Sequence, residues 1–194
     1  MEFDYLDTGA LYRAVALNFV RLGLKEDAAD KDIKEALVKT DVKFRDSRVF
    51  LNGEDVSSGI RSPEAGHLAS VFSARKPVRE FLMETQKNAA EHADIVAEGR
   101  DMTTVVFPSA FRKIYLDASV EERKKRRVKD LLSKGFEANE ENIRREITER
   151  DERDSGRDLA PLKKADDALL IDSSGLSIQE VFSRIMDIIR GKDR

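Results

Sequence analysis

The sequence contains no cysteine and only two histidines, His67 and His92. Without cysteine the chain forms no disulfide bond and has no thiol nucleophile, which fits a reducing compartment. Two histidines far apart in the sequence argue against a histidine-based metal site. We therefore expect a cytoplasmic protein whose chemistry depends on other side chains.

Long apolar runs, a strong net charge, internal repeats and low-complexity linkers are also missing. No apolar stretch approaches the length needed to cross a membrane, and the acidic start Met1-Glu2-Phe3-Asp4 does not resemble a signal peptide. The formal net charge is only −3, so there is no overall attraction to nucleic acid or to anionic membranes. We expect neither as a partner.

What is present is a chain of 194 residues that is 40% hydrophobic and 38% charged, enough for one domain or a core with one insertion. Short apolar segments at residues 3–7, 95–97, 112–117 and 168–172 read as strands, and helical patterns follow them. This alternation predicts an α/β fold with a parallel sheet.

The segment Asp94–Pro108 contains the most informative of these strands. Its apolar run is followed at once by Glu98-Gly99-Arg100-Asp101. Open α/β sheets bind ligands just beyond the carboxyl ends of their strands, where Arg100 suits phosphate and Asp101 suits an amino group or a metal. A surface loop with a local Arg–Asp pair is an equally good interpretation of this stretch alone.

The first helix offers a second candidate phosphate contact. Thr8 can cap it, and Arg13 is expected in its first turn, near the carboxyl end of the preceding strand. A phosphate could be held there by Arg13, Thr8 and free backbone N–H groups. Pairing of Arg13 with Asp7 is the structural alternative.

Residues 27–92 form a predicted insertion between two strands of the parallel sheet. Alternation at 42–45 and 49–51 predicts an antiparallel hairpin, Asn52-Gly53 predicts a further turn, and residues 54–56 predict a third short strand. Ser62-Pro63 and Pro77 start two helices. These helices carry Ser70 and Arg79, for which solvent exposure is the simplest interpretation.

The helix after Ser119 is strongly basic from Arg123 to Lys129. Ser119 and Glu122 fit a capping box, and Glu122 lies one turn before Arg126, so part of this charge is paired within the helix. A solvated basic face is favoured over an anion-binding face. Ser177 and Glu180 form a second capping box before an apolar-striped C-terminal helix.

The segment from Arg150 to Pro161 follows a helix that starts near Glu140. Arg150, Asp154 and Arg157 are spaced four and three apart, so they share one face as long as the helix continues. Two guanidinium groups around one carboxylate would make a cradle for a polyanion, and Gly156 would make the segment mobile. A salt-bridged helix end is the alternative.

Three segments together resemble the bacterial cytidylate kinases. They are Tyr5-Leu6-Asp7-Thr8-Gly9-Ala10-Leu11-Tyr12-Arg13, then Glu98-Gly99-Arg100-Asp101-Met102 with Val105–Pro108, then Arg150-Asp151-Glu152-Arg153-Asp154 through Pro161. Gly53-Glu54-Asp55-Val56-Ser57 resembles part of that family's nucleotide-binding insert. The resemblance covers essentially the whole chain.

This resemblance implies a P-loop nucleoside monophosphate kinase fold with a parallel sheet. Residues 1–26 and 93–194 would form the core, including a lid at about 123–160, and residues 27–92 would form a small α+β insert that binds the acceptor nucleotide. The implied reaction is the transfer of a phosphoryl group from ATP to CMP or dCMP, with Mg²⁺ accompanying ATP, by a monomer.

The resemblance also implies roles for individual residues. Ser70, Arg79 and Asp101 would read the cytosine edge. Arg13, Arg100 and Arg157 would hold the acceptor phosphate, and Thr8 would line the same pocket. Arg150 and Asp154 would contact the sugar. Arg123, Arg127 and Arg153 would lie near the ATP phosphates, and Arg100, Arg153 and Arg157 would be the catalytic residues.

The sequence departs from the family pattern in two places. Thr103 stands where the family usually has glycine. The family also begins with a strand, a glycine-rich phosphate loop and a helix, whereas this sequence starts after them. Its only Gly-Lys pair, Gly191-Lys192, precedes Asp193 instead of Ser or Thr, so there is no Walker A motif.

The missing motif leads us to expect little or no kinase activity from these 194 residues, and a poorly stable or aggregation-prone chain. A CMP-binding module without catalysis and a P-loop kinase for another small acceptor, such as UMP or shikimate, stay open as alternatives. RNA binding by the basic helix is the weakest alternative, since the chain is acidic overall and no aromatic residues interrupt the basic run.

Overall fold

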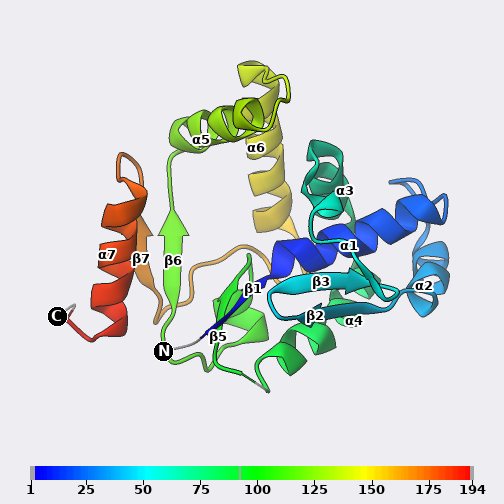
Figure 1. Ribbon diagram of the computed structural model, residues 1–194, viewed down its shortest axis with the longest axis horizontal. Helices are drawn as coiled ribbons and strands as arrows, with labels where there is room; N and C mark the ends of the chain where they lie inside the picture. The colour runs from blue at the N-terminus through cyan, green and yellow to red at the C-terminus, as the bar shows by residue number, and fades with distance from the viewer. Residues whose placement is uncertain (1–2, 92, 193–194) are drawn as a thin grey trace. The chain divides into compact units, whose positions relative to one another are not determined.

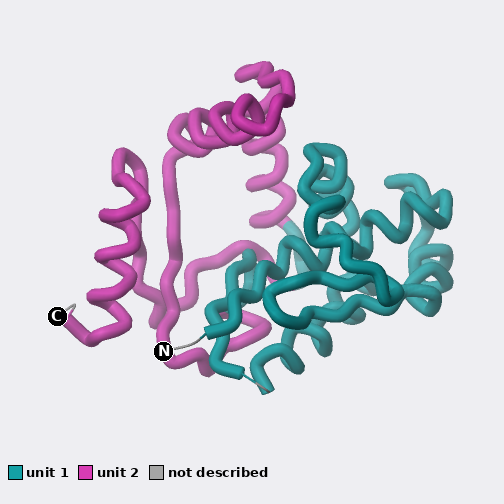
Figure 2. Tube along the Cα trace, in the orientation of Figure 1, with its two compact units in different colours: residues 1–102, 157–159 teal, residues 103–156, 160–194 magenta. Residues whose placement is uncertain are grey.

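The computed structural model describes residues 3–91 and 93–192, so His92 lies outside the described residues (Figure 1). The chain divides into two compact units, coloured separately in Figure 2. Unit 1 comprises residues 1–102 and 157–159, and unit 2 comprises residues 103–156 and 160–194. This division does not test the domain boundaries expected from the sequence.

Unit 1 is built around a two-stranded parallel sheet of β1 (Asp4–Asp7) and β5 (Ile95–Glu98). In register, Asp4 lies opposite Ile95 and Asp7 lies opposite Glu98. Between these strands the chain forms α1 (Thr8–Arg21), α2 (Asp30–Val38), β2 (Val42–Arg45), β3 (Arg48–Leu51), β4 (Glu54–Asp55), a 3-10 turn η1 (Gly59–Arg61), α3 (Pro63–Ser73) and α4 (Lys76–Ala89). The strands and helices expected between the two parallel strands are therefore present.

The antiparallel hairpin of this segment has the predicted strands and turn chemistry. β2 pairs with β3, and β3 pairs with β4. Asp46 and Ser47 connect the first two strands with φ values of 51° and 57°, and Asn52 and Gly53 connect the next two with φ values of 50° and 85°. Positive φ at both central residues matches the right-handed twist of a two-residue hairpin loop.

The hydrophobic core of unit 1 is built around α1. Phe19 and Phe72 are fully buried and meet edge to face, with ring centroids 4.9 Å apart. The other large apolar side chains that are fully buried in this core are aliphatic, namely Leu6, Leu11, Val15, Ile33, Leu51, Ile60, Val78 and Leu82. They come from both strands and helices, so α1 and the elements that follow it share one core.

The start of α1 differs from the prediction. Asp7, not Thr8, is the N-cap, because its carboxylate accepts a hydrogen bond of 3.0 Å from the Ala10 N–H. Thr8 is the first helical residue. The Thr8 hydroxyl therefore does not cap the helix and bonds to the end of β5 instead.

Unit 2 contains a second two-stranded parallel sheet, formed by β6 (Ile114–Asp117) and β7 (Leu169–Asp172). Its helices are α5 (Val120–Ser133), α6 (Glu140–Gly156) and α7 (Ile178–Ile189). A short π-helical turn η2 (Met102–Val106) begins at the last residue of unit 1's main segment and contains Thr103. The parallel pairing expected from the sequence is present, divided between two separate sheets.

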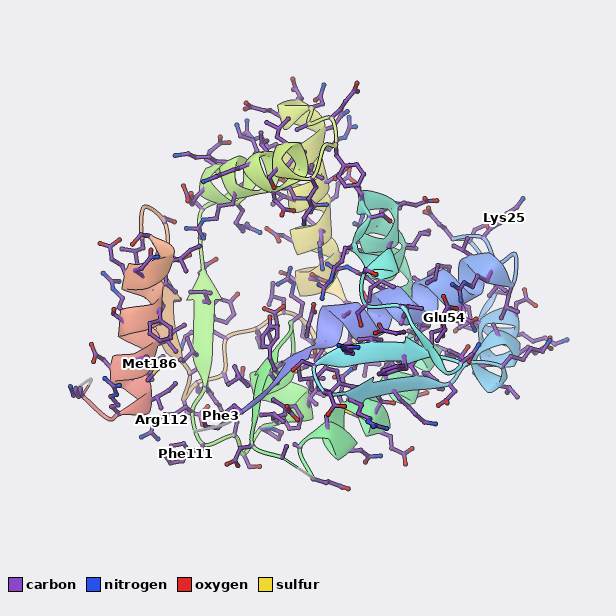
Figure 3. The ribbon with its side chains drawn as sticks, in the orientation of Figure 1. Phe3, Lys25, Glu54, Phe111, Arg112 and Met186 are labelled. Atoms are coloured by element: carbon purple, nitrogen blue, oxygen red, sulfur yellow. The ribbon has the colours of Figure 1, made fainter. Side chains whose placement is uncertain are left out.

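The ends of the unit 2 helices are tied by polar side chains. Ser177 and Glu180 form the predicted capping box of α7. Ser119 caps α5 by accepting from the Glu122 N–H, whereas the Glu122 carboxylate binds Arg126 at 2.8 Å. Arg112 lies against the neighbouring Phe111 ring, 4.1 Å from its centroid, and donates to the Ile188 carbonyl near the end of α7 (Figure 3).

No helix in residues 3–91 or 93–192 is both long enough and apolar enough to cross a membrane.

Candidate functional site

The carboxyl ends of β1 and β5 meet at one edge of the unit 1 sheet, since Asp7 and Glu98 are directly opposite. Thr8 is buried there, and its hydroxyl donates a hydrogen bond of 2.7 Å to the Glu98 carbonyl. This bond joins the start of α1 to the end of β5. The polar residues that follow both strands therefore begin at this same edge of the sheet.

Gly99 is required at this edge because there is no room for a side chain. A Cβ atom on Gly99 would lie 2.5 Å from the Thr8 hydroxyl oxygen and 2.9 Å from the Met102 methyl group. Contacts under 3.0 Å force a neighbour to move. The glycine thus permits the turn and also the close approach of Thr8 to the strand end.

The central feature of the site is a buried ion pair between Arg79 of α4 and Asp101. Their side chains are 3% and 4% exposed, and the Arg79 Nη2 donates to Asp101 Oδ2. Arg79 Nη1 also donates to the Ser73 carbonyl at 3.2 Å. The expectation that Arg79 and Ser70 are solvent-exposed is wrong, since both are buried. A buried charge pair with a planar donor and a carboxylate acceptor can read the edge of a heterocyclic base.

A second set of charges surrounds Asp7 at the start of α1. Its Oδ2 accepts from Arg61 Nη1 at 2.7 Å and lies 4.0 Å from Arg13 Nη1. Asp7 therefore holds two guanidinium groups beside the first turn of α1. The alternative interpretation of Arg13 as a partner of Asp7 has some support, at the longest distance of an ion pair. Arg61 had no sequence signal that singled it out.

Arg100 is exposed at the end of β5, next to the buried Asp101. Arg157 is half-buried and belongs to unit 1. Since α6 ends at Gly156, Arg157 lies beyond the helix. The expected helical face of Arg150, Asp154 and Arg157 is thus interrupted at its last member. Unit 1 holds seven of the candidate residues, namely Thr8, Arg13, Ser70, Arg79, Arg100, Asp101 and Arg157.

The remaining candidates belong to α5 and α6 of unit 2. Arg150 Nε lies 3.7 Å from the buried Asp154 carboxylate, and Arg153 Nη1 lies 3.9 Å from Glu149. The Asp154 backbone carbonyl accepts from the Leu162 N–H at 2.7 Å, which ties the end of α6 to the following loop. These contacts leave the roles of Arg150, Arg153 and Asp154 as predictions.

Most of the basic helix α5 is paired with carboxylates. Arg123 makes two hydrogen bonds, of 2.9 and 2.6 Å, to Asp151 of α6, and this bidentate pair raises the pKa of Arg123. Arg127 lies 3.3 Å from Asp130. A self-paired face explains α5 well, and the proximity of Arg123 and Arg127 to ATP phosphates stays a prediction.

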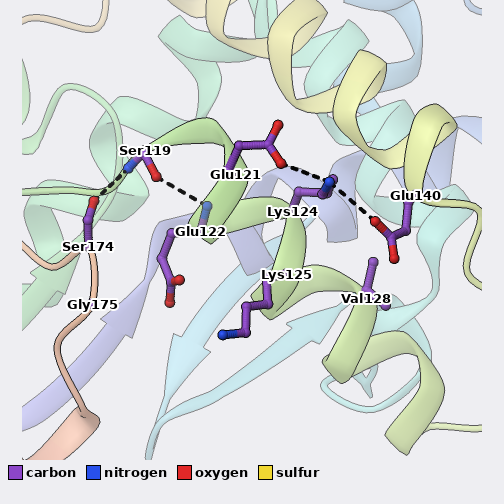
Figure 4. Close-up of a pocket in the computed structure, with 9 residues that line it drawn as sticks. All are labelled: Ser119, Glu121, Glu122, Lys124, Lys125, Val128, Glu140, Ser174 and Gly175. Carbon is purple, nitrogen blue, oxygen red and sulfur yellow. Dashed lines mark hydrogen bonds and ion pairs between the residues drawn. The ribbon is translucent and has the colours of Figure 1, made fainter.

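A pocket of about 510 Å³ opens beside the start of α5 (Figure 4). Lys124 lies in it between Glu121, at 2.8 Å, and Glu140, at 3.2 Å. The Ser119 N–H donates to the Ser174 hydroxyl oxygen, in the loop before α7, at 2.9 Å. Several of the charged and polar groups that line the pocket are thus paired with one another.

The comparison with known proteins decides the family. The model of the family described as cytidylate kinase matches residues 1–191.

The chain belongs to the cytidylate kinase family.

Individual relatives carry the same description. The cytidylate kinase of Thermodesulfovibrio yellowstonii is 48% identical over 190 residues, which cover 96% of this chain and 86% of the relative. That of Fervidobacterium nodosum is 47% identical over 194 residues, covering 100% and 88%. That of Thermotoga maritima is 43% identical over 190 residues, covering 98% and 86%. This member of the cytidylate kinase family is therefore an enzyme by close relationship along nearly its entire sequence.

The family relationship accounts for the mixed α/β architecture with parallel sheets. It gives no support to the expected inactivity of the 194 residues. The residues at the ends of β1 and β5 come from two of the segments that resemble cytidylate kinases, and the structure places these strand ends at one sheet edge.

Proposed function

We propose that this protein transfers the γ-phosphoryl group of ATP to CMP or dCMP, giving ADP and CDP or dCDP. The observation that carries the proposal is the buried Arg79–Asp101 pair at the edge where β1 and β5 end. Membership in the cytidylate kinase family supports the same reaction. The fold we propose is the P-loop nucleoside monophosphate kinase fold, with residues 27–92 as the acceptor insert and about 123–160 as the lid.

The ion pair has the polarity needed for cytosine. Cytosine presents an amino donor beside a ring-nitrogen acceptor, so the Asp101 carboxylate would accept from the amino group while Arg79 would donate to the ring nitrogen. Uracil has a carbonyl acceptor in place of the amino donor and a ring N–H donor in place of the ring-nitrogen acceptor. With uracil, Asp101 would therefore face an acceptor and Arg79 would face a donor. Ser70, buried near the end of α3, would complete the base contacts.

Phosphoryl transfer needs positioning and charge neutralisation more than a protein nucleophile. An oxygen of the CMP phosphate forms the new bond to the γ-phosphorus as the bond to the ADP oxygen breaks. Arg13, Arg100 and Arg157 would hold the acceptor phosphate, with Thr8 beside them. From the lid, Arg153 would act on the transferred group, Arg123 and Arg127 would approach ATP, and Arg150 with Asp154 would contact the sugar.

Mg²⁺ would accompany ATP in this reaction and neutralise charge on its phosphates. Among residues 3–91 and 93–192, no group of three or more His, Asp or Glu side chains could hold a metal ion. Magnesium in nucleotide sites is bound largely by phosphates and water, with one or two carboxylates. No side chain of this protein is therefore assigned to it.

Calorimetry with CMP, dCMP and UMP tests the acceptor site without requiring turnover. We expect CMP and dCMP to bind more tightly than UMP. Asp101→Asn should weaken CMP binding by about 10-fold or more, because it replaces a charged acceptor. Glu54→Gln removes an equal charge from the exposed hairpin and should leave CMP binding unchanged. Tighter binding of UMP than CMP by the unchanged chain would reject the assignment of the base.

A coupled assay of ADP production tests the transfer itself. It should be run on the 194-residue chain and on the same chain joined to the Walker A segment of a cytidylate kinase. CMP-dependent ADP release supports the proposal. CMP binding without release in either form would favour a CMP-binding module instead. Release by the 194-residue chain alone, at an ordinary enzymatic rate, would show that the expected inactivity is wrong.

A further inference from the structure

Behind the Arg79–Asp101 pair, unit 1 contains a series of polar side chains that the proposed function does not use. The Arg79 guanidinium carbon lies 5.7 Å from the centroid of the Tyr12 ring. Gln86 is 1% exposed and follows Arg79 by seven residues, so both lie on one face of α4. Burial raises the pKa of Tyr12, while Arg79 and a hydrogen bond from the Gln86 carboxamide act to lower it. The order of contacts is Gln86, Tyr12, Arg79, Asp101.

Gln86 is poorly explained as a packing residue. Its neighbours on the same face of α4, Val78 and Leu82, are fully buried and apolar. Within the described residues, the buried Gln86 Oε1 has no hydrogen-bond partner. A buried polar atom without a partner costs stability, and an apolar side chain of similar size would avoid that cost. The carboxamide therefore does something at this position that packing does not require.

The contacts of Arg79 indicate what the Gln86 carboxamide contributes. One Nη group is directed to Asp101 and the other to the Ser73 carbonyl, and the buried Nε has no partner among the described residues. Both Nη groups of the guanidinium are therefore hydrogen-bonded, and only its Nε side lacks a partner within the described part of the chain. The guanidinium carbon lies over the Tyr12 ring, and this contact adds to the two hydrogen bonds in resisting rotation of the group, since cation–π contacts are favourable when desolvated. Gln86 in turn holds the Tyr12 hydroxyl.

We propose that Gln86 and Tyr12 are positioning residues that set the preference for cytosine over uracil by fixing the plane of the Arg79 guanidinium. The inference rests on the proposed function, since it concerns the same base-reading pair. Loss of the Gln86–Tyr12 contact frees the ring, and the guanidinium then turns out of the plane of the Asp101 carboxylate. The hydrogen bonds that distinguish cytosine from uracil depend on the orientation of the guanidinium, so they are lost first. Binding of CMP therefore weakens more than binding of UMP. The arginines proposed for the phosphate are untouched.

Three single variants test this proposal. Gln86→Met keeps the volume and removes the carboxamide. Tyr12→Phe keeps the ring and removes the hydroxyl. Leu82→Met is the matched control, a volume-conserving change at a fully buried position on the same face of α4. For each, calorimetry or competition gives the dissociation constants of CMP and UMP, and urea unfolding gives the stability.

We expect Gln86→Met and Tyr12→Phe each to reduce the ratio of CMP to UMP affinity by about 3- to 10-fold, the range for loss of one hydrogen bond. The double variant should be no worse than the worse single variant, because both remove one contact. Leu82→Met should alter stability without altering the ratio. If the 194-residue chain or its fusion to a Walker A segment turns over CMP, both variants should raise KM for CMP while kcat stays within about two-fold.

The outcomes distinguish failure of the proposed function from failure of this inference. If the unchanged chain binds no CMP, the proposed function fails and this inference fails with it. If the chain prefers CMP and both variants keep the preference, the inference alone is overturned. It is also overturned if Leu82→Met changes the ratio as much as Gln86→Met does, since the effect would then be one of packing.

Discussion

The burial and bonding of a single residue in this protein depend on its neighbours in space more than on the sequence pattern around it. Arg79 shows this well. Its sequence position on a helix favours exposure, yet its side chain is only 3% exposed. It pairs with Asp101, donates to the Ser73 carbonyl and lies over the Tyr12 ring. Such a pair is weak as a source of stability but costly to break, because one charge is then left buried without its partner.

We predict that Asp101→Ala lowers the free energy of unfolding by about 3–5 kcal/mol. Urea denaturation followed by circular dichroism measures this change. The matched control is Arg21→Ala, which breaks the Arg21–Glu54 pair between two exposed side chains and should leave stability nearly unchanged. Equal effects of the two substitutions would show that the Arg79–Asp101 pair is not buried in solution.

We predict that Gly99→Ala destabilises the protein by about 1–3 kcal/mol, because its Cβ would displace the Thr8 hydroxyl or the Met102 side chain. Gly66→Ala is the contrasting variant. Gly66 lies inside α3, and a Cβ atom there would meet nothing within 4 Å, so alanine should stabilise by about 0.5–1 kcal/mol. Thermal unfolding of both variants gives the opposite shifts, and a neutral Gly99→Ala would contradict the close approach of Thr8.

At the scale of elements, the ends of helices are held by short-range contacts that sequence spacing already indicates. The α7 capping box is reciprocal, with Ser177 Oγ accepting from the Glu180 N–H at 3.2 Å and the Glu180 carboxylate accepting from the Ser177 N–H at 2.8 Å. α7 is amphipathic, and its first apolar residue Ile178 is 84% exposed, so its first turn has little packing to hold it. The cap is correspondingly important.

We predict that Ser177→Ala destabilises the folded state by about 1 kcal/mol at neutral pH. The loss should be local, with faster amide hydrogen exchange in the first turn of α7. Ser133→Ala is the control, since the Ser133 hydroxyl only donates to the Asp130 carbonyl at the end of α5. Similar exchange changes in α7 for both variants would argue against the capping box.

The same box predicts a pH dependence. Hydrogen bonds from Ser177 lower the pKa of Glu180 below its ordinary value of 4.5. A lowered folded-state pKa stabilises the protein above the unfolded value, and this contribution is lost as the pH falls through the folded value. The stability difference between the unchanged protein and Ser177→Ala should therefore shrink below about pH 4.5. Unfolding curves at about pH 7 and about pH 3 measure it, and a difference that grows on acidification would reverse the assignment.

At the scale of the whole molecule, the two units differ in how well their cores are filled. All the large apolar side chains that are under 2% exposed belong to unit 1 among the described residues. In unit 2 the best-buried aliphatic residue, Val106, is 3% exposed, and large apolar side chains face solvent, including Phe111, Leu116, Leu170, Ile178 and Phe182. Unit 2 therefore gains less from burial per residue than unit 1 does.

We predict that unit 2 opens at a lower free energy than unit 1, since regions with few buried apolar contacts exchange first. Hydrogen exchange monitored by mass spectrometry should show later exchange in α1 and β3 than in β7 and α7. Addition of CMP should slow exchange around α1, α4 and the end of β5, with a smaller effect from UMP at equal concentration. Uniform protection of both units without ligand would contradict the difference in packing.

Most elements of this protein were predictable from local sequence because their causes are local. Proline and serine at the start of α3, the two-residue turns of the hairpin, and the capping box of α7 depend on residues no more than a few positions apart. The parallel pairing of β1 and β5 was also predictable, since short apolar runs separated by helical patterns require crossover connections.

Predictions that depended on distant neighbours were less successful. Thr8 was expected to cap α1, but its hydroxyl reaches Glu98, ninety positions away, and Asp7 takes the cap. Arg157 was expected to share a helical face with Arg150, but α6 ends one residue earlier. The contacts of Gln86, Tyr12 and Arg61 were missed because nothing in their local sequence marks a polar partner on another element.

The sequence by itself determined the family, the alternation of strands and helices, and the residue types needed for nucleotide chemistry, since these depend on composition and on spacing along the chain. Only the tertiary structure decided that Arg79 and Asp101 form a buried pair, that Gly99 must lack a side chain, and that Gln86 is buried on the same face of α4 as Arg79. Those features arise where segments far apart in the chain exclude water together, and burial is what gives their charges and hydrogen bonds directional strength.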